Sequence, residues 1–235
     1  MKSYAMPKNI FAILIWSFHH TINYIKNKLE LEKYKLRVLY YMTPVENLEN
    51  ILRFGILSKN EIKRRNLSYE SFALESVQER RDAKKIQLSD LKKRKSLHDC
   101  IPLYIAYKTP TLYYIFKNHP HEYGRIIFIR IRSKIVLHKA FCFTDGNAAS
   151  QNSREYYDLG NLNRIDWNVV NGTYWNDEFD GKRKRCAEFL IYPNVERRFF
   201  DLIIVKSYDI KREVESILQK LEFRLNVEHN PAYYF

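Results

Sequence analysis

The chain has 235 residues and carries 40 Lys and Arg against 27 Asp and Glu, which gives a formal net charge of +13. This length suits a single domain with a sizeable core. So large a positive charge attracts polyanions and makes nucleic acid the leading partner. Aromatic residues form 15% of the chain, which suits base stacking and argues mildly against a membrane-surface protein, although Phe and Tyr more often fill a core.

The cysteines and glycines exclude several classes of protein. Cys100, Cys142 and Cys186 lie far apart without a C-x-x-C pair, so neither disulfides nor a zinc site are indicated, and we expect a protein of the reducing cytoplasm. With 6 Gly, the chain contains neither a G-x-G-x-x-G loop nor a P-loop, which argues against Rossmann dehydrogenases and P-loop ATPases. No G-x-S-x-G motif anchors a catalytic triad.

Residues 1–35 are predicted to form an N-terminal helical extension. The apolar run Ile10–Trp16 is too short to span a bilayer and no small-residue cleavage site follows it, so we expect neither a membrane anchor nor a signal peptide. A helix is predicted from Pro7 to about Tyr34, because apolar residues recur there at helical spacing. They are Ile10, Leu14, Phe18, Ile22, Ile25 and Leu29.

The segment after this extension predicts a strand followed by a capped helix. Residues 36–42 are rich in strand formers, and Thr43-Pro44-Val45-Glu46 fits a capping box with Thr as the cap and Pro at the first helical position. The helix would bury Leu48, Ile51 and Leu52. It would end near Gly55, which tolerates the positive φ of a C-terminal cap.

The remainder predicts one α+β domain over residues 36–235. Residues 58–95 are polar and charged and predict helical turns and loop. Strands outnumber long helices beyond them, and no internal repeat occurs. Strands are predicted at Ile101–Tyr107, Arg125–Ile131, His138–Phe143, Glu188–Tyr192 and Asp201–Val205, with helices at Pro110–Lys117 and Ile210–Leu221.

Glu188 is an unusual residue because this carboxylate stands between the cationic run 182–185 and an apolar strand. From this context alone, a surface position on a strand is the commoner explanation. A nuclease is also conceivable, with Asp145 and Glu188 holding a divalent cation, but no lysine follows two residues after Glu188 to assist a metal-bound water. His19-His20 and His119-Pro120-His121 lack further ligands at metal-site spacing. A basic nucleic-acid-binding protein and a metal-dependent nuclease therefore stay open as alternatives.

Five segments in order match one known pattern: Leu39–Leu48 leading to Gly55, Gln78-Glu79-Arg80-Arg81, Leu97–Tyr104 running on to Tyr113, Phe143–Asn147, and Lys184–Leu190. Together they resemble the DarT family of toxins, which ADP-ribosylate bases in single-stranded DNA using NAD. The resemblance spans roughly Leu36 to Phe235. It implies an ADP-ribosyltransferase fold, in which a split, twisted β core clamps NAD without a Rossmann loop.

The resemblance implies that Glu188 is the catalytic glutamate. Breaking the bond from nicotinamide to ribose develops an oxocarbenium-like cation, which a fixed carboxylate stabilises. The family's glutamate is also thought to act as a general base toward the acceptor. Arg81 matches the second arginine of the Q-E-R-R motif and is implied in catalysis and in binding the NAD phosphates, which suit a guanidinium. Without the resemblance, Arg81 would be a solvated charge.

The resemblance also implies the remaining NAD contacts. Tyr104 and Tyr113 fall where the family places aromatic residues around the nicotinamide half. Thr43 and Asn47 lie at the first strand-to-helix junction, where a helix N-terminus offers backbone donors, although Thr43 is also a good helix cap. Tyr41 stands where most relatives carry a His, so we expect its hydroxyl against the NAD amide or ribose.

A further departure concerns the acceptor. Pro44 replaces a second His of the family pattern, which indicates a divergent branch whose target base is thymine or guanine. Asn147 follows Gly146 where some relatives have His, and is expected to contact DNA or NAD. In the loop before Glu188 we expect two aromatic residues to stack on bases and four cations to follow the phosphates, unless the Trp is core and the lysines are solvated. These residues are Tyr174, Trp175, Lys182, Arg183, Lys184 and Arg185.

The function implied is an NAD-dependent mono-ADP-ribosyltransferase acting on single-stranded DNA. It would be the toxin of a toxin–antitoxin or phage-defence pair, with a macrodomain antitoxin whose ADP-ribosylglycohydrolase activity removes the mark. NAD would be the co-substrate without any metal. We expect a cytoplasmic monomer with no membrane partner.

Overall fold

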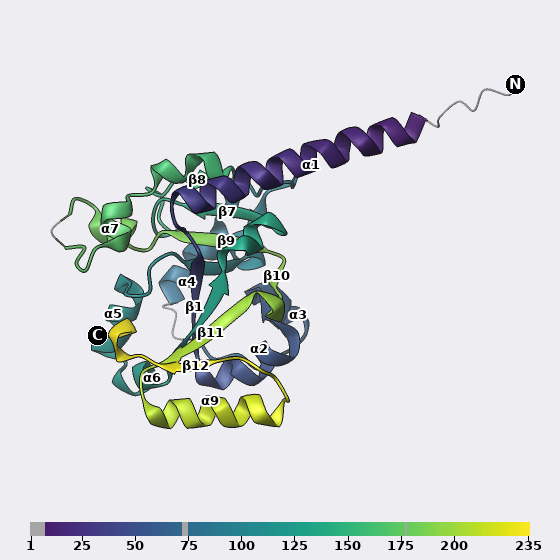
Figure 1. Ribbon diagram of the computed structural model, residues 1–235. Helices are drawn as coiled ribbons and strands as arrows, with labels where there is room; N and C mark the ends of the chain where they lie inside the picture. The colour runs from purple at the N-terminus through teal and green to yellow at the C-terminus, as the bar shows by residue number, and fades with distance from the viewer. Residues whose placement is uncertain (1–7, 72–74, 177) are drawn as a thin grey trace, which may run out of the picture.

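An eight-stranded sheet organises the fold, with the strand order β12-β11-β6-β1-β5-β9-β7-β8 (Figure 1). The computed structural model describes residues 8–71, 75–176 and 178–235. Neighbouring strands pair antiparallel except β11 and β12, which are parallel. The strands are β1 Val38–Pro44, β5 Ile101–Tyr104, β6 Ile126–Arg132, β7 Ala140–Thr144, β8 Glu155–Tyr156, β9 Glu188–Tyr192, β11 Phe200–Val205 and β12 Val227–His229.

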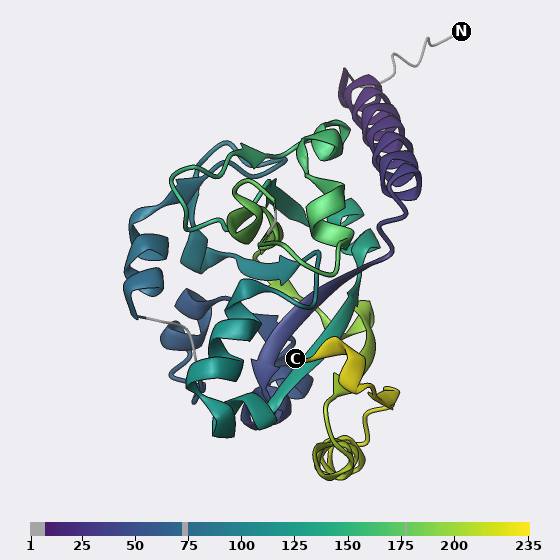
Figure 2. The ribbon, with the colours of Figure 1, turned by 90° about the vertical axis from the view of Figure 1, so that its left-hand side faces the viewer.

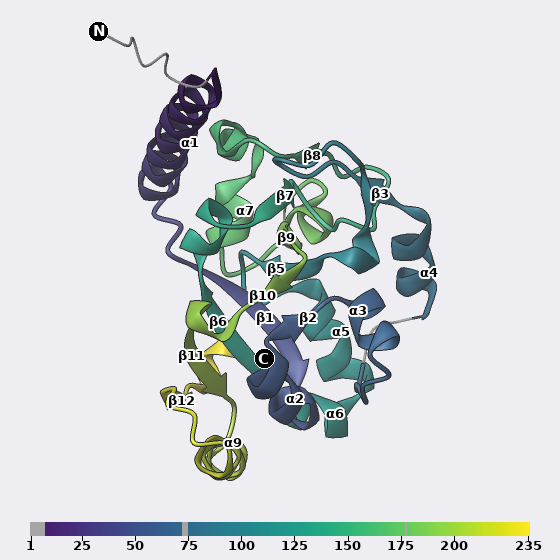
Figure 3. The same cartoon turned by 90° about the vertical axis from the view of Figure 1, so that its right-hand side faces the viewer.

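Helices and two small ribbons surround this sheet (Figures 2 and 3). The ribbons pair β2 Ile56–Leu57 with β10 Asn194–Val195, and β3 Lys85–Ile86 with β4 Lys95–Ser96. The helices are α1 Lys8–Lys33, α2 Leu48–Phe54, α3 Lys59–Arg64, α4 Glu75–Ala83, α5 Pro110–Asn118, α6 Pro120–Gly124, α7 Trp167–Asn171, α8 Gly181–Lys184 and α9 Tyr208–Lys220.

The sheet is divided at the junction of β1 and β5. Strand β1 pairs with β6 along its whole length, whereas β1 and β5 share one pair, Tyr40 opposite Tyr104. The two halves, β12-β11-β6-β1 and β5-β9-β7-β8, therefore diverge beyond this point. This is the split β core that the family resemblance implies.

The predicted α+β class is confirmed, and so are its main elements. The five strands predicted after residue 100 correspond to β5, β6, β7, β9 and β11, and the two helices correspond to α5 and α9. Helix α2 buries the three predicted residues and ends at Gly55 with φ of +79°. A side chain at Gly55 would also meet the carbonyl oxygen of Val195, so glycine suits this cap for two reasons.

The predicted capping box at Thr43 is wrong. Pairing with β6 continues through Thr43 and Pro44, which keeps Thr43 extended inside β1. A 3₁₀ turn at Val45–Asn47 then precedes α2, and its first position has no side-chain cap. The Glu46 carboxylate pairs with Arg125 instead of reaching back to the strand.

Helix α1 is confirmed, but its apolar stripe does not pack on the domain along the part that is described. Ile22, Ile25 and Leu29 are 46%, 51% and 58% exposed, whereas Leu31 is buried where α1 meets the domain. The side chains of the earlier stripe positions lie outside the described residues. Helix α1 projects away from the domain in Figures 1 and 2. No helix in the described part of the chain is long and apolar enough to cross a membrane.

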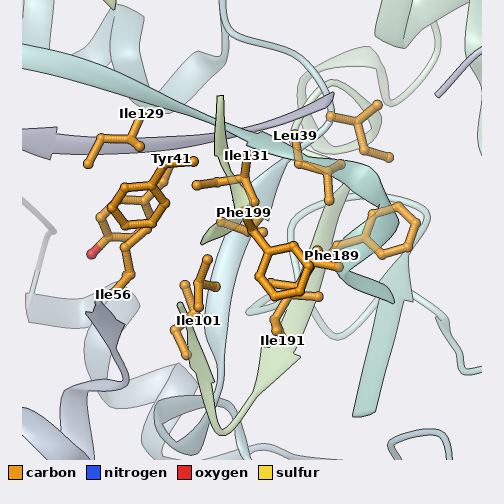
Figure 4. Close-up of a cluster of buried hydrophobic side chains, with 14 of the residues drawn as sticks. Leu39, Tyr41, Ile56, Ile101, Ile129, Ile131, Phe189, Ile191 and Phe199 are labelled. Atoms are coloured by element: carbon orange, nitrogen blue, oxygen red, sulfur yellow. The ribbon is translucent and has the colours of Figure 1, made fainter. Parts of the chain in front are cut away.

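One large apolar cluster fixes the two halves of the sheet against each other. Leu39 and Ile131 from one half meet Phe189 and Ile191 from the other (Figure 4). Alternating positions of a strand face opposite sides, yet Leu190 is buried as well, so β9 is covered on both faces. The first residue of β9 is Glu188, and its backbone is therefore held rigidly.

Candidate active site

Glu188 lies at the start of the interior strand β9 and is 2% exposed. It stands opposite Tyr104 on β5, and directly opposite residues of an antiparallel pair point to the same face of the sheet. A buried carboxylate is costly unless it is paired and hydrogen-bonded. The surface position favoured by sequence context alone is therefore wrong, and the partners of this carboxylate become the central question.

Arg81 and one backbone amide hold the Glu188 carboxylate. Arg81 donates from Nη1 to Oε1 at 3.3 Å, and the backbone N–H of Ala148 donates to the same oxygen at 2.8 Å. Oε2 of Glu188 and Nη2 of Arg81 are both buried and have no hydrogen-bond partner among the described residues. An unpaired acceptor thus stands beside an unpaired donor, which is the pattern expected where a polar ligand completes the set.

Arg81 reaches this position from the last turn of α4 and is 8% exposed. The alternative of a solvated charge is therefore wrong. Gln78, one turn earlier on the same face, also lines the cavity and accepts a hydrogen bond from Lys59 at 2.9 Å. The Q-E-R-R segment thus directs its first and last residues inward.

A cavity of about 880 Å³ opens where β1 and β5 diverge. Such a volume falls within the range of about 300–1,000 Å³ that small-molecule sites occupy. The residues that line it come from β1, α4, β5, α5, α8 and the segments that connect these elements, and Arg81 is among them whereas its partner Glu188 is not. They include Tyr41, Thr43, Arg81, His98, Tyr104, Thr111, Tyr114, Asn147, Lys182, Arg183 and Cys186.

Two neutral phenols shape the aromatic side of the cavity. The hydroxyl of Tyr104 donates to Thr111 at 3.5 Å, and burial raises the pKa of Tyr104 far above its ordinary value. Tyr41 contacts the hydroxyl of Tyr69 at 3.4 Å, and burial raises the pKa of Tyr41 as well. Both predicted cofactor residues therefore line the cavity as uncharged aromatic groups.

Asn47 has a structural position outside the lining of the cavity, and its contact with NAD stays a prediction. Its amide nitrogen donates to Thr43 Oγ1 at 3.0 Å and to the carbonyl of Glu70 at 2.8 Å, while its oxygen accepts from the Glu70 N–H at 2.9 Å. These contacts use both N–H donors and tie the segment before α4 to the end of β1. Thr43 lines the cavity, with its hydroxyl accepting this bond from Asn47.

The helical phase of α5 turns Tyr113 away from the cavity, so its contact with NAD stays a prediction. Thr111, Tyr114 and Ile115 line the cavity, and their spacing of three and four residues defines one helix face. Tyr113 points elsewhere and packs edge-on against Phe235, with ring centroids 5.2 Å apart. Tyr114 is therefore the aromatic residue that α5 contributes, and the sequence analysis missed it.

Arg185 is not available to DNA phosphates, so that prediction is corrected. Its side chain is buried, with Nε donating to the carbonyl of Lys108 at 2.7 Å. Nη1 donates to the carbonyls of Val169, Val170 and Gly172. Arg185 therefore joins the α7 segment to the loop before α5.

The other residues predicted to contact DNA fall into two groups, those bound by the protein itself and those exposed to solvent. Arg183 pairs with Asp145 at 2.8 Å and also with Asp180, and Lys184 pairs with Asp166 at 2.9 Å. Trp175 is 7% exposed and packs in the aromatic group with Tyr113 and Phe235, so it belongs to the core and not to a stacking surface. These three side chains are held by the protein. By contrast, Lys182 and Tyr174 are exposed, and Lys182 lines the cavity.

The sequence did not reveal one residue of the cavity wall, His98, or one exposed aromatic residue shortly before Glu188 in the chain, Phe179. His98 is buried at the cavity wall, its Nδ1 contacts Asp82, and its Nε2 has no partner among the described residues. Phe179 is 91% exposed in the loop before Glu188. An apolar residue within the polar stretch Asn176–Lys182 was a signal for Phe179, whereas the Asp82–His98 contact left no pattern in the sequence.

Comparison with known proteins agrees with this geometry. The family model of the ssDNA thymidine ADP-ribosyltransferase DarT matches residues 40–235. A DNA ADP-ribosyl transferase of Thermus sp. (strain 2.9) is 30% identical over 190 residues, which cover 77% of this chain and 87% of that protein.

Solved structures show the same fold. Thermus sp. 2.9 DarT in complex with ADP-ribosylated ssDNA superposes with a TM-score of 0.76 at 26% identity, covering 86% of this chain and 97% of that one. Thermosipho africanus DarTG in complex with ADP-ribose superposes with a TM-score of 0.73 at 26% identity, covering 85% of this chain and 51% of that one. The chain belongs to the DarT family of ssDNA ADP-ribosyltransferases.

Proposed function

We propose that this chain is an NAD-dependent mono-ADP-ribosyltransferase that modifies a base in single-stranded DNA. Family membership supports the reaction class, and the Thermus relative was solved with ADP-ribosylated ssDNA. The observation that carries the proposal is the buried Glu188–Arg81 pair with one unpaired polar atom on each partner. The acceptor is thymine, as in the family's description, or guanine, because Tyr41 and Pro44 depart from the family's two histidines.

NAD fits the polar atoms that the cavity offers. Among the described residues, Arg81 Nη2 is a donor without a partner for a phosphate or carbonyl oxygen, and Glu188 Oε2, buried beside Arg81, is an acceptor without a partner for a ribose hydroxyl. Tyr41, Tyr104 and Tyr114 supply aromatic surface for the flat ring of nicotinamide. When bound there, NAD would supply a ribose whose bond to nicotinamide can break.

In this proposal Glu188 stabilises the charge that develops at the reacting carbon of the ribose. The carboxylate is fixed by β9, Arg81 and the Ala148 N–H, so it needs no rearrangement during the reaction. Glu188 then accepts the proton that the attacking base nitrogen loses, which makes it the general base of the second half of the reaction. Arg81 positions the carboxylate and holds an oxygen of the donor.

The loop that precedes Glu188 is suited to a DNA strand. Tyr174 and Phe179 are 77% and 91% exposed on the loop that precedes Glu188, which leaves both rings free to stack on bases. Lys182 lies at the cavity wall and is exposed. Asn147 also lines the cavity, beside the Ala148 N–H that holds the carboxylate.

We further propose that the chain is a toxin. The Thermosipho africanus relative, 27% identical over 205 residues, is a DNA ADP-ribosyl transferase–DNA ADP-ribosyl glycohydrolase fusion protein, of which this chain covers 50%. A separate macrodomain antitoxin with glycohydrolase activity would take the place of that second part and reverse the modification. The toxin would act as a monomer in the cytoplasm, in a toxin–antitoxin or phage-defence pair.

Nothing in the described structure favours the nuclease alternative. Asp145 accepts from Arg183 at 2.8 Å and from the Arg154 N–H at 2.9 Å, and the Glu188 carboxylate is held by Arg81. A divalent cation at these two carboxylates would have to displace the side chains of Arg183 and Arg81. Asp145 and Glu188 are therefore better explained as the ion-pair partners of these two arginines.

The proposal is tested with labelled NAD and single-stranded oligonucleotides of varied sequence. Label should appear on DNA with the wild type and not with Glu188→Ala. Equal labelling by both proteins, or none by either, would refute the proposal, and cleaved DNA that requires a divalent cation would favour a nuclease. Mass spectrometry of digested nucleosides then identifies the modified base.

A further inference from the structure

A second cavity of about 850 Å³ borders the loop after β7, which gives the Ala148 N–H to Glu188. The proposed reaction assigns no role to this cavity. It is framed by the end of α4, by β8 and by the 3₁₀ segment Leu159–Arg164, and Figure 3 shows α4, β3 and β8 along this side of the molecule. Five cations and one carboxylate line it. They are Arg80, Lys84, Arg94, Arg154, Arg164 and Glu155.

Most of this positive charge is not neutralised by the protein. Arg94 pairs with Glu155 at 2.6 Å, which uses the one carboxylate. Arg80, Arg154 and Arg164 are exposed and form no ion pair with the residues that the structure describes. Unpaired arginines around one concave surface repel each other and favour an anionic ligand with several charges.

Lys84 connects this basic groove, the surface lined by the five cations, to the active site. Its Nζ donates to the carbonyl of Ser150 at 2.9 Å, and burial lowers the pKa of Lys84 below its ordinary value. Ser150 lines the Glu188 cavity, whereas its neighbours Ala149 and Gln151 line the basic groove. The loop that gives the Ala148 N–H to Glu188 is thus a wall shared by the two cavities.

Consecutive arginines on α4 divide between the same two cavities. Arg81 faces Glu188, while Arg80 lines the basic groove. A DNA strand whose target base enters the cavity beside Glu188 can therefore continue over the shared wall into the basic groove. The single pyrophosphate of NAD carries fewer negative charges than the groove has cations. A DNA strand presents one phosphate for every nucleotide and can therefore contact several of these cations.

We infer that the basic groove holds the phosphodiester backbone of the single-stranded DNA on one side of the modified base. This inference rests on the proposed DNA ADP-ribosylation. Arg154 and Arg164 contact phosphates, and the amides of Gln151 and Asn161 lie at the same surface to meet base edges or sugar oxygens. The groove sets affinity for the strand, while Glu188 and Arg81 carry out the transfer.

The test uses the double variant Arg154→Ala/Arg164→Ala in a steady-state transfer assay. With NAD saturating, the KM for a long oligonucleotide should rise about tenfold, and the slope of log affinity against log salt should fall by about 1.4, because each single-strand phosphate contact contributes about 0.7. The KM for NAD should stay within about twofold. With the shortest oligonucleotide that still accepts label, wild type and variant should differ little.

The control is Arg212→Ala/Lys220→Ala, which also removes two positive charges, but from α9 at the opposite end of the molecule, where they form ion pairs with Asp209 and Glu49 (Figure 1). Its KM for DNA should equal that of the wild type. Arg154→Gln/Arg164→Gln replaces the first variant if thermal unfolding shows that the alanine protein is not folded.

The outcomes separate the two proposals. A wild type that transfers no label to DNA overturns the proposed function itself. A wild type that transfers label, together with a groove variant whose KM for DNA matches the α9 control, overturns the groove inference alone. A rise in the KM for NAD instead of DNA also overturns it and assigns the groove to the dinucleotide.

Discussion

Two basic stretches reach the same cavity, and they use their charges differently. The run 182–185 stands directly before Glu188 in the chain, yet three of its four cations are bound by the protein's own carboxylates and carbonyls. Arg80 and Arg81 stand at the end of α4, and Arg81 lies 107 positions from Glu188 in sequence. Arg81 nevertheless touches the carboxylate and keeps one donor unpaired among the described residues.

The difference separates a cation that builds the site from one that binds a ligand. Arg185 is as deeply buried as Arg81, at 4% against 8% exposure, so burial does not distinguish them. What distinguishes them is the number of hydrogen bonds that the guanidinium makes. Arg185 donates to four backbone carbonyls, whereas Nη2 of Arg81 has no partner among the described residues. We therefore expect substitutions in the two stretches to fail in different ways.

The largest effect is expected for Arg81. Arg81→Ala should lower transfer by about 100-fold or more, because it removes both the partner of Glu188 and a donor for the ligand. The protein should still fold, because the Ala148 N–H continues to hold the carboxylate, but its free energy of unfolding should be lower than that of the wild type. Arg81→Lys should restore little, because an ammonium group cannot make a planar two-point contact. Retained transfer in Arg81→Ala, measured with labelled NAD, would refute the assigned role.

Arg185→Ala should act on stability. The substitution leaves four carbonyl oxygens without their donor, so we expect the free energy of unfolding to fall by about 3 kcal/mol. Urea titration measures this loss, and activity should fall in parallel with the folded fraction. A stable Arg185→Ala protein with a raised KM for DNA would show that Arg185 binds phosphate after all.

Lys182→Ala should have a smaller effect, confined to DNA. Lys182 is exposed at the cavity wall and has no ion-pair partner in the described part of the chain. We expect its loss to raise the KM for the oligonucleotide about threefold, and to leave the free energy of unfolding within about 0.5 kcal/mol of wild type. An equal effect of Lys184→Ala would contradict the distinction, because Lys184 is paired with Asp166.

The smallest effect concerns pH and His98, a buried group whose Nε2 has no partner among the residues that the structure describes. Burial lowers the pKa of His98 below its ordinary value of 6.5, so just below that pH the unfolded chain binds a proton that the folded chain does not. The free energy of unfolding should therefore fall as the pH decreases through about 6.5. His98→Gln should lose less stability than wild type over this interval in urea titrations, whereas the exposed His121→Gln should follow wild type.

Much of the fold was predictable because its strands are apolar runs. The segments that became β5, β6, β9 and β11 are rich in Ile, Leu and Phe, and a strand buried on both faces needs such a run. The capping box failed because Thr43 and Pro44 extend the pairing of β1 with β6, a long-range interaction that local sequence does not reveal.

The site was predictable only where the resemblance supplied residues. Glu188, Arg81 and Tyr104 meet in the structure, although no local pattern connects positions so far apart. Tyr113 was predicted in place of Tyr114 because the phase of α5 depends on how that helix packs. The cations before Glu188 could not be sorted from sequence, because their partners come from three separate segments, at Asp145, at Lys108 and around α7.

The central claim is that Glu188 performs the transfer within a set of polar atoms that a ligand completes. Its most direct test compares Glu188→Gln, which keeps the shape of the side chain and removes its charge, with Glu215→Gln on the exposed face of α9. Transfer of label from NAD to single-stranded DNA should fall by about 100-fold or more in Glu188→Gln and remain unchanged in Glu215→Gln, with both proteins folded. Transfer by folded Glu188→Gln at the wild-type rate would contradict the account.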